Sequence, residues 1–154
     1  MPDSNQIQIQ FSIADIQTLE FVIFNLPDIA SLDKTKFPFK IEAGFFFEVE
    51  NKIVGIDIIV DISADSAPNP IVCHMITRFK FLINNFNEAF TIKEGNITYP
   101  SQFLITLISI SLSTTRGILL SKTESTNLRG IFMPIIDPSK LIMVTATDPN
   151  KAAE

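Results

Sequence analysis

The 154-residue sequence has one cysteine, one histidine, no tryptophan and five glycines, none of them next to another. A single cysteine, Cys73, excludes an internal disulfide and favours a reducing compartment. One thiol and one imidazole are too few for a zinc site built from such ligands. Isolated glycines exclude a glycine-rich phosphate loop. These absences argue against the common metal and phosphate sites, so we expect no cofactor and no bound metal.

Basic residues are also scarce: 12 Lys and Arg oppose 17 Asp and Glu, for a net charge of −5. Such a balance argues against a nucleic-acid surface, which needs clustered positive charge. The start, MPDSNQIQIQ, has neither the basic residues nor the apolar core of a signal peptide. The longest uncharged stretch, residues 95–115, is interrupted by Pro100 and by many Ser and Thr residues, whereas a membrane span needs about 20 mostly apolar residues. We therefore expect a soluble cytoplasmic protein with no nucleic-acid partner and no membrane insertion.

Apolar residues are abundant, with 14 Phe and 46% hydrophobic residues overall. This composition excludes a disordered chain, and the length favours one domain. We expect a single domain over residues 1–154, with a sheet at about 6–84, a helical part at about 98–143 and a flexible tail at 144–154. The mean hydropathy of +0.30 is high for a soluble monomer. Either the chain associates with other copies, or it keeps apolar surface exposed for a partner.

The first half of the chain alternates apolar and polar residues with the period of two that is typical of half-buried strands. The first such segment runs to Phe24, with an irregularity at Ala14–Asp15 that is typical of a β-bulge. Residues 39–49, 54–62 and 71–83 alternate in the same way, and Asn51–Lys52 is a candidate two-residue turn. Strands with short turns and one apolar face predict an antiparallel sheet.

The chain after Thr98 must cover the apolar face of this sheet. Pro100 suits the first turn of a helix, and residues 103, 104, 107, 108, 111 and 112 form a stripe at helical spacing. Residues 107–113 also alternate, so the pattern alone leaves a strand open, but the length favours a helix. After Gly130, an extended connector leads to a short last helix that Asp137 and Pro138 cap and that runs through Met143. The predicted fold class is α+β: a four-stranded antiparallel sheet covered by a long helix and a short C-terminal helix.

The sequence offers little for catalysis. Cys73 and His74 are neighbours in a strand, so their side chains point to opposite faces and cannot form a dyad; we expect Cys73 to be a buried, inert thiol. Asp57 and Asp61 share a face but lie roughly 13 Å apart on strand geometry. Arg116 follows an apolar stretch, and we expect it to lie at a helix end and bind carbonyl or carboxylate groups in a structural role, with direct ligand contact as the alternative. An enzyme is therefore the least favoured class; it would need a cleft that holds a carboxylate or His74 with a strongly shifted pKa.

The polar side of each long strand carries an apolar residue. Because these residues lie on neighbouring strands, they can merge into one patch. One interpretation is a subunit interface; the other is an apolar groove that accepts a partner. The residues that we expect to contact a client are Phe46, Ile59, Ile76 and Leu82.

The order of these elements resembles the SecB family of export chaperones over most of the chain. The first strand (residues 8–16, with IQFSIADI) and the fourth (70–83, PIVCHMITRFKFLI) resemble the corresponding strands of that family. Residues 100–142 resemble its carboxy-terminal half: an apolar helix with an Arg, here Arg116, then a break containing Gly, an apolar connector with Pro, and a final Asp-x-x-Leu helix.

The resemblance implies a non-enzymatic holdase that works without ATP. Family members assemble as dimers of dimers, bind unfolded polypeptides in apolar grooves and pass them to the SecA motor through an acidic sheet surface. Asp15 and Glu20 lie near the family's acids on the first strand, but His74 stands where the family has an acid after the Cys, and Ser113–Thr115 replaces its aromatic approach to the Arg. The implied function is thus a SecB-like chaperone of a homotetrameric family, with protein export through a SecA-type motor as one role. The alternative is a non-catalytic module for a dedicated protein partner, such as a toxin–antitoxin chaperone, or for a small apolar ligand.

Overall fold

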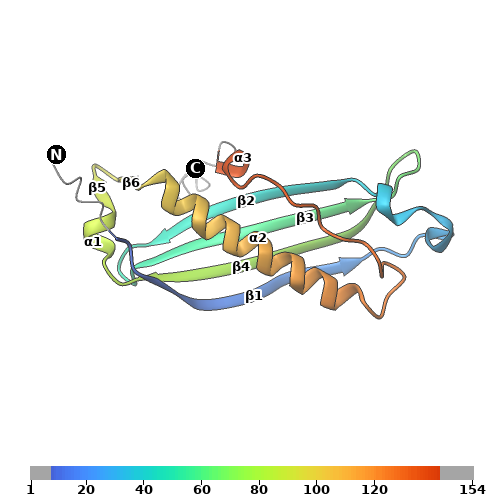
Figure 1. The fold of residues 1–154 in the computed structure, drawn as a ribbon, viewed down its shortest axis with the longest axis horizontal. Helices are drawn as coiled ribbons and strands as arrows, with labels where there is room; N and C mark the ends of the chain where they lie inside the picture. Colours follow the sequence, from blue (N-terminus) through green and yellow to red (C-terminus); the bar gives the residue numbers. More distant parts are fainter. Residues whose placement is uncertain (1–7, 143–154) are drawn as a thin grey trace, which may run out of the picture.

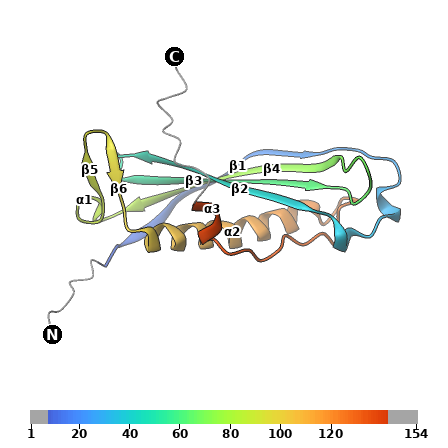
Figure 2. The ribbon, with the colours of Figure 1, turned by 90° about the horizontal axis from the view of Figure 1, so that it is seen from above.

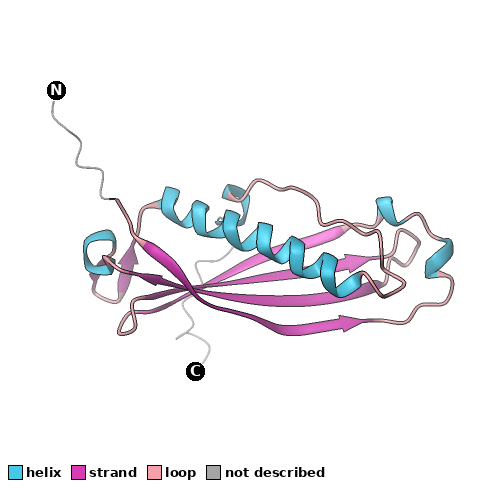
Figure 3. Cartoon of the chain, turned by 60° about the horizontal axis from the view of Figure 1, so that its bottom comes forward, coloured by secondary structure: helices cyan, strands magenta, loops and turns pink. Residues whose placement is uncertain are grey.

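The structure, a computed structural model, describes residues 8–142. A four-stranded antiparallel sheet forms one layer, and two helices cover one of its faces (Figures 1 and 3). Seen along the sheet, the long and the last helix lie on the same side (Figure 2). The predicted α+β fold is therefore confirmed. The strands of the sheet and the helices are β1 (Phe11–Ile23), β2 (Phe39–Glu48), β3 (Ile53–Ser63), β4 (Ile71–Ile83), α1 (Phe86–Ala89), α2 (Ser101–Thr123) and α3 (Ser139–Ile142).

The strand order is β1-β4-β3-β2, so β1 and β2 are the two edges of the sheet. The chain crosses from β1 to β2 through two short 3₁₀ turns, η1 (Ile29–Ser31) and η2 (Lys34–Lys36). The bulge expected at Ala14–Asp15 is present as a register shift between Ile13 and Asp15, and a second shift lies between Thr18 and Glu20. Two irregularities in one edge strand increase its twist and reduce its pairing.

The core lies between the sheet and α2, as the alternation predicts. Every second residue of β3 and β4 faces α2 and is fully buried, for example Ile56, Ile58 and Phe79. From α2, Leu107 and Ile108 pack against them. We call the face of the sheet opposite to α2 the outer face.

Two parts of the chain differ from the sequence prediction. The turn between β2 and β3 spans four residues, 49–52, rather than two, because Glu48 and Ile53 are the last residues that pair; Lys52 adopts φ 56° in it. The segment between β4 and α2, where the sequence pattern predicts no element, contains α1 and a small hairpin of β5 (Thr91–Lys93) and β6 (Asn96–Thr98). Glu94 and Gly95, both at positive φ, make its turn.

The predicted helices are present within the described residues. α2 begins after Pro100 and continues through Gly117 to Thr123. Asp137 accepts hydrogen bonds from the backbone N–H and the hydroxyl of Ser139 at the start of α3. The beginning of the expected first strand at residues 6 and 7, Met143 and the expected flexible tail 144–154 lie outside the described residues.

Candidate functional site

The four apolar residues that we expected to contact a client all lie on the outer face. Phe46 comes from β2, Ile59 from β3, and Ile76 and Leu82 from β4, and each is partly exposed. Ile59 and Ile76 are direct partners in the β3–β4 ladder. The structure thus brings the predicted residues onto one surface of neighbouring strands.

Phe46 is less available than its neighbours on this surface. The far end of its ring occupies the space beside Gly55, where a Cβ atom would lie 2.0 Å from Cζ of Phe46. The guanidinium of Arg78 lies 4.8 Å from the centre of the ring, within the range of a cation–π contact. Because position 55 is a glycine, the ring of Phe46 can pack flat against the sheet, where Arg78 covers it.

Ion pairs between β4 and the other strands connect several polar residues of the outer face. Arg78 forms a two-pronged contact with Asp57, with nitrogen–oxygen distances of 2.8 and 2.7 Å. Asp57 thus serves to hold Arg78, and Asp61 in the same strand contacts His74 instead. Farther along β4, Lys80 donates to Glu48 at 2.7 Å. The two aspartates therefore have separate partners.

The three residues expected to dock a motor lie on β1 and β4. Nε2 of His74 lies 3.5 Å from Oε2 of Glu20, and Nδ1 of His74 lies 2.5 Å from Oδ1 of Asp61. The hydrogen bond with Asp61 raises the pKa of His74 above its ordinary value, and Glu20 adds to this shift. Asp15 stands apart from this pair, opposite Lys80 in the β1–β4 register.

Cys73 points to the other face of β4, as the sequence analysis predicts, and is fully buried in the core. Burial is the main reason why the pKa of its thiol rises to about 11, and the charge of Asp61 contributes. A thiol with such a pKa is protonated at neutral pH and is a poor nucleophile. Among residues 8–142, no group of three or more His, Cys, Asp or Glu side chains is arranged to hold a metal ion.

The largest set of exposed apolar side chains lies on β1 and the residue after it, and the sequence pattern did not predict it. Five residues at the edge of the sheet are between 36% and 49% exposed: Ile13, Ile16, Leu19, Val22 and Phe24. We call them the β1 strip. Alternation had placed Ile13 on the core face, and it does face the side of α2. A residue on the core face of an edge strand stays exposed, however, when the covering helix does not reach it.

α2 contacts β1 near both ends of the strand. Phe103, at the start of α2, packs edge-to-face against Phe11 with 5.4 Å between ring centres. Lys122, near its end, lies 5.2 Å from the centre of the Phe21 ring. The helix runs obliquely across the sheet (Figure 1), and Ile13 and Ile16, which lie between these two contacts along β1, remain 49% and 38% exposed.

The side of α2 that faces away from the sheet is nearly free of charge. Arg116 is the only charged residue between Ser101 and Ser121. An 18-residue window of α2 has a mean hydropathy of 1.7, yet only 39% of it is buried. The helix is thus long and apolar enough to cross a membrane, although a core helix of a soluble protein passes the same test. A helix with apolar residues outside the stripe that packs on the sheet is typical of a helix whose other side is also covered by protein.

Arg116 holds the connector that returns from α2 to α3. Its Nε donates to the carbonyl oxygen of Met133 and its Nη2 to that of Pro134, both at 3.1 Å. The connector buries Ile131 and Met133 but leaves Phe132 69% exposed. Arg116 thus contacts backbone carbonyls from within α2, not from its end.

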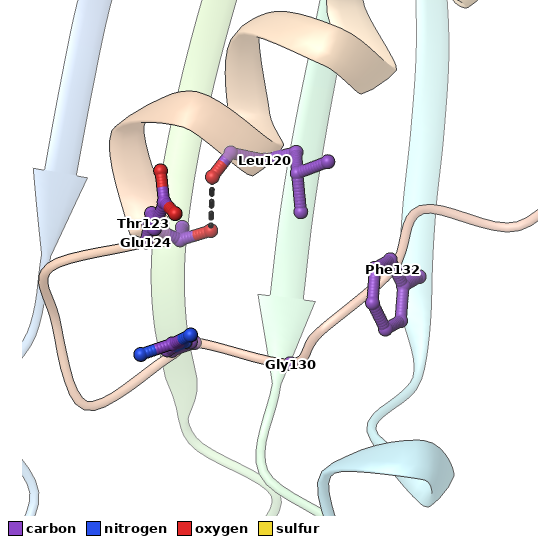
Figure 4. Close-up of a pocket in the computed structure, with 6 residues that line it drawn as sticks. Leu120, Thr123, Glu124, Gly130 and Phe132 are labelled. Carbon is purple, nitrogen blue, oxygen red and sulfur yellow. Dashed lines mark hydrogen bonds between the residues drawn. The ribbon is translucent and has the colours of Figure 1, made fainter.

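A shallow hollow of about 270 Å³ lies between the end of α2 and the start of the connector. Figure 4 shows Leu120 and Phe132 on opposite sides of it, with Gly130 below. Gly130 adopts φ 91°, which allows the sharp change of direction after α2. The volume of the hollow is below that of typical small-molecule sites, about 300–1,000 Å³. The hollow is therefore better suited to contact with a single side chain than to enclosing a ligand.

The comparisons with known proteins agree with this architecture. No family model and no curated protein matches the sequence. The chain is similar to the solved structure of a SecB-like chaperone of Mycobacterium tuberculosis in complex with a ChAD peptide from the HigA1 antitoxin. The TM-score is 0.50 at 12% identity, over 82% of this chain and 90% of that chain. A protein of unknown function from Streptococcus agalactiae matches with a TM-score of 0.42 at 14% identity, over 83% of this chain and 99% of that one. The first similarity shows the fold: this chain has the SecB-like arrangement of a four-stranded sheet, a long helix and a short helix.

Proposed function

We propose that this protein is an ATP-independent chaperone that binds extended, unfolded polypeptides along β1. The observation that carries the proposal is the β1 strip, because it places exposed apolar side chains along an edge strand and on Phe24, the residue that follows it. Such an edge offers unpaired backbone groups as well as apolar contacts. Peptides add to exposed strands in this way, with backbone hydrogen bonds for affinity and side chains for selectivity.

The energetics of the strip suit a binder with low sequence selectivity. Fully burying one side chain of this size is worth about 1.5–3 kcal/mol. The strip presents its residues on both sides of the edge, since Ile16 pairs with Phe79 on the α2 side and Val22 with His74 on the outer face. An extended client therefore gains contacts without having to match a single deep pocket. Ile59, Ile76, Leu82 and the edge of Phe46 extend the proposed contact surface across the outer face.

The polar groups of the sheet support a binding role over catalysis. Asp57, Asp61 and Glu48 are each engaged by a base on β4, and Cys73 is buried. We infer a non-enzymatic, cytoplasmic protein that needs no cofactor.

The structural neighbour binds a peptide from an antitoxin, and this supports a second candidate, a chaperone for one dedicated partner. If the protein instead serves export, we propose that it docks to a SecA-type motor through Asp15, Glu20 and His74. The contact between Glu20 and His74 favours the dedicated partner, because it neutralises part of the acidity that a motor-docking surface would present.

We propose further that α2 packs against a second copy of the chain, in a homo-oligomer such as a dimer of dimers. Its outward residues include Ser113 and Gly117, and a Cβ on Gly117 would meet nothing within 4 Å. Gly117→Glu places a charge on this surface and should dissociate the oligomer, whereas Gly117→Ala should not. Analytical ultracentrifugation distinguishes the two; an unchanged sedimentation coefficient for the folded Glu variant would exclude this surface as the interface.

The binding proposal is tested by diluting a denatured, slowly refolding precursor into buffer and following light scattering. We expect suppression that saturates at a fixed ratio of subunits to client, with no effect of ATP. The double variant Ile13→Asp/Ile16→Asp should lose the suppression. The matched control Asn96→Asp/Thr98→Asp adds the same charge at two exposed residues of β6, outside the four-stranded sheet, and should keep it. Equal suppression by the two folded variants would remove the β1 strip from the site, and no suppression by the wild type would contradict the general holdase and favour the dedicated partner.

A further inference from the structure

His74 lies between two carboxylates that come from two different strands. On β3, Oδ1 of Asp61 lies 2.5 Å from Nδ1 of the ring. On β1, Oε2 of Glu20 lies 3.5 Å from Nε2. The imidazole of β4 therefore bridges three strands of the sheet on its outer face.

Only the protonated ring can serve both carboxylates. An imidazolium carries a hydrogen on each nitrogen, whereas the neutral ring carries one. Because Asp61 is the closer partner, the single hydrogen of the neutral ring stays on Nδ1. The lone pair of Nε2 then faces the Glu20 carboxylate and repels it. The contact between β4 and Glu20 thus requires a proton on His74.

Glu20 is attached at a weak place in the sheet. It follows the second register shift of β1, between Thr18 and Glu20, where the ladder to β4 is interrupted. β1 is also an edge strand, and within the described residues its only partner in the sheet is β4. Interrupted edge strands open locally at low free-energy cost, so a side-chain contact beyond the interruption has a large relative effect there.

We propose that His74 is a proton-controlled tie that fastens the last residues of β1 to the sheet and releases them when it loses its proton. Release exposes more of the edge at Leu19 and Val22 and frees the negative charge of Glu20. The inference concerns the conformation of β1 and stands whether or not the protein binds unfolded polypeptides.

The other charged groups near His74 do not compete for it. On β2, Lys40 pairs with Asp61 in the register, but its Nζ lies 3.3 Å from Oε1 of Glu42. On β4 itself, Arg78 is engaged by Asp57. α2 lies on the opposite face and contributes no charge to this site. Asp61 and Glu20 both raise the pKa of His74, so the tie opens at a higher pH than the loss of the proton from an isolated histidine.

Amide hydrogen exchange followed by NMR tests the tie directly. His74 is the only histidine of the chain, so it is the only side chain with an ordinary pKa between pH 5.5 and 8.5. We expect the protection factors of the Phe21, Val22 and Ile23 amides, corrected for intrinsic exchange, to fall about two- to fivefold over this range, which is the size of a partly exposed ion pair. Protection that does not change with pH would overturn the proposal.

Two variants separate the tie from a structural role of the ring. Glu20→Gln keeps the fold, since Glu20 is an exposed side chain, but should lower the pKa of His74 and remove the pH dependence of protection. Asp15→Asn, an acid on the same face of β1 that lies away from His74, should leave both unchanged. If the pKa of His74 is the same in the Glu20→Gln variant as in the wild type, Glu20 does not interact with the protonated ring. This result would also overturn the proposal.

Discussion

The ring of Phe46 occupies the space that a side chain at Gly55 would need. The two residues are partners in the β2–β3 ladder, and a Cβ atom on Gly55 would lie 2.0 to 2.3 Å from three atoms of the ring. Arg78 then covers the ring. The relationship explains why a glycine stands in the middle of a strand, where it normally weakens the structure.

Gly55→Ala should therefore destabilise the protein although alanine suits a strand better. The new methyl group forces the end of the Phe46 ring off the sheet and away from Arg78. Because this partly exposed side chain can turn aside, we expect the loss to be about 0.5–1 kcal/mol, the size of the cation–π contact. The free energy of unfolding in urea measures the change.

Gly44→Ala is the matched control for this substitution. Gly44 lies on the same face, but its Cβ would meet only Cβ of Asp57, at an ordinary 3.8 Å. We expect it to raise stability slightly, by up to about 1 kcal/mol, because the unfolded chain loses freedom. Equal effects of the two substitutions would contradict the steric explanation.

The sequence predicts the layers of this fold because alternation and helical spacing are local signals. The faces of β3 and β4, the bulge at Ala14–Asp15 and the start of α2 after Pro100 all follow from such patterns. The pairing of β1 with β4 does not, since strand order depends on which apolar faces meet across the whole chain. The hairpin of β5 and β6 was missed because strands of three residues are too short to show a period.

The candidate site was predictable to a lesser degree. The alternation placed Phe46, Ile59, Ile76 and Leu82 together on the outer face, where the structure also has them. It could not show that the Phe46 ring lies against Gly55, because this contact depends on the register between β2 and β3. Nor could it reveal the β1 strip. Ile13 and Ile16 have the pattern of core residues, and only the oblique path of α2 leaves them exposed.

Arg116 should contribute to stability through the connector. Arg116→Gln removes two hydrogen bonds from a charged donor to the carbonyls of Met133 and Pro134. Together these bonds are worth roughly 1–3 kcal/mol, and their loss leaves two acceptors with weaker partners. We expect lower stability in urea and faster amide exchange at residues 131–136. Arg129→Gln, at the rim of the hollow, should change stability by less than about 0.5 kcal/mol; an equal loss in both variants would argue against the role of Arg116.

Thr115 is buried in the face of α2 that packs against the sheet, and its hydroxyl has no hydrogen-bond partner. An unpaired buried hydroxyl costs about 1–3 kcal/mol. Thr115→Val keeps the shape and removes the hydroxyl, so we expect the melting temperature to rise. In the control Thr123→Val, the lost hydroxyl donates to the carbonyl of Leu119 at 2.9 Å, and no such gain is expected. A lower melting temperature for Thr115→Val would show that this hydroxyl has a partner in solution.

His74 should make stability fall as the pH rises above the unfolded pKa of histidine, about 6.5. Its pKa is higher in the folded protein than in the unfolded chain, mainly because of Asp61. The folded state therefore binds the proton more tightly, and the stabilisation is complete below about pH 6.5, the unfolded value. It is lost as the pH rises through the higher folded pKa. Urea midpoints between pH 5.5 and 9 should fall in the wild type and stay level in His74→Gln; a rise with pH would contradict the assignment.

The outer face makes a separate contribution to the proposed client binding, which can be measured apart from the β1 strip. Ile59→Thr/Ile76→Thr replaces two neighbouring, partly exposed side chains by β-branched residues of similar shape, so the sheet should stay folded. Each substitution removes apolar contact worth about 1 kcal/mol at partial burial, which corresponds to a roughly fivefold weaker Kd per residue. Fluorescence anisotropy with a labelled unfolded peptide gives the Kd. A second double variant on this face, Phe46→Asp/Ile76→Asp, should abolish capture with the secondary structure intact. Unchanged Kd values in both folded double variants would leave β1 as the sole contact surface.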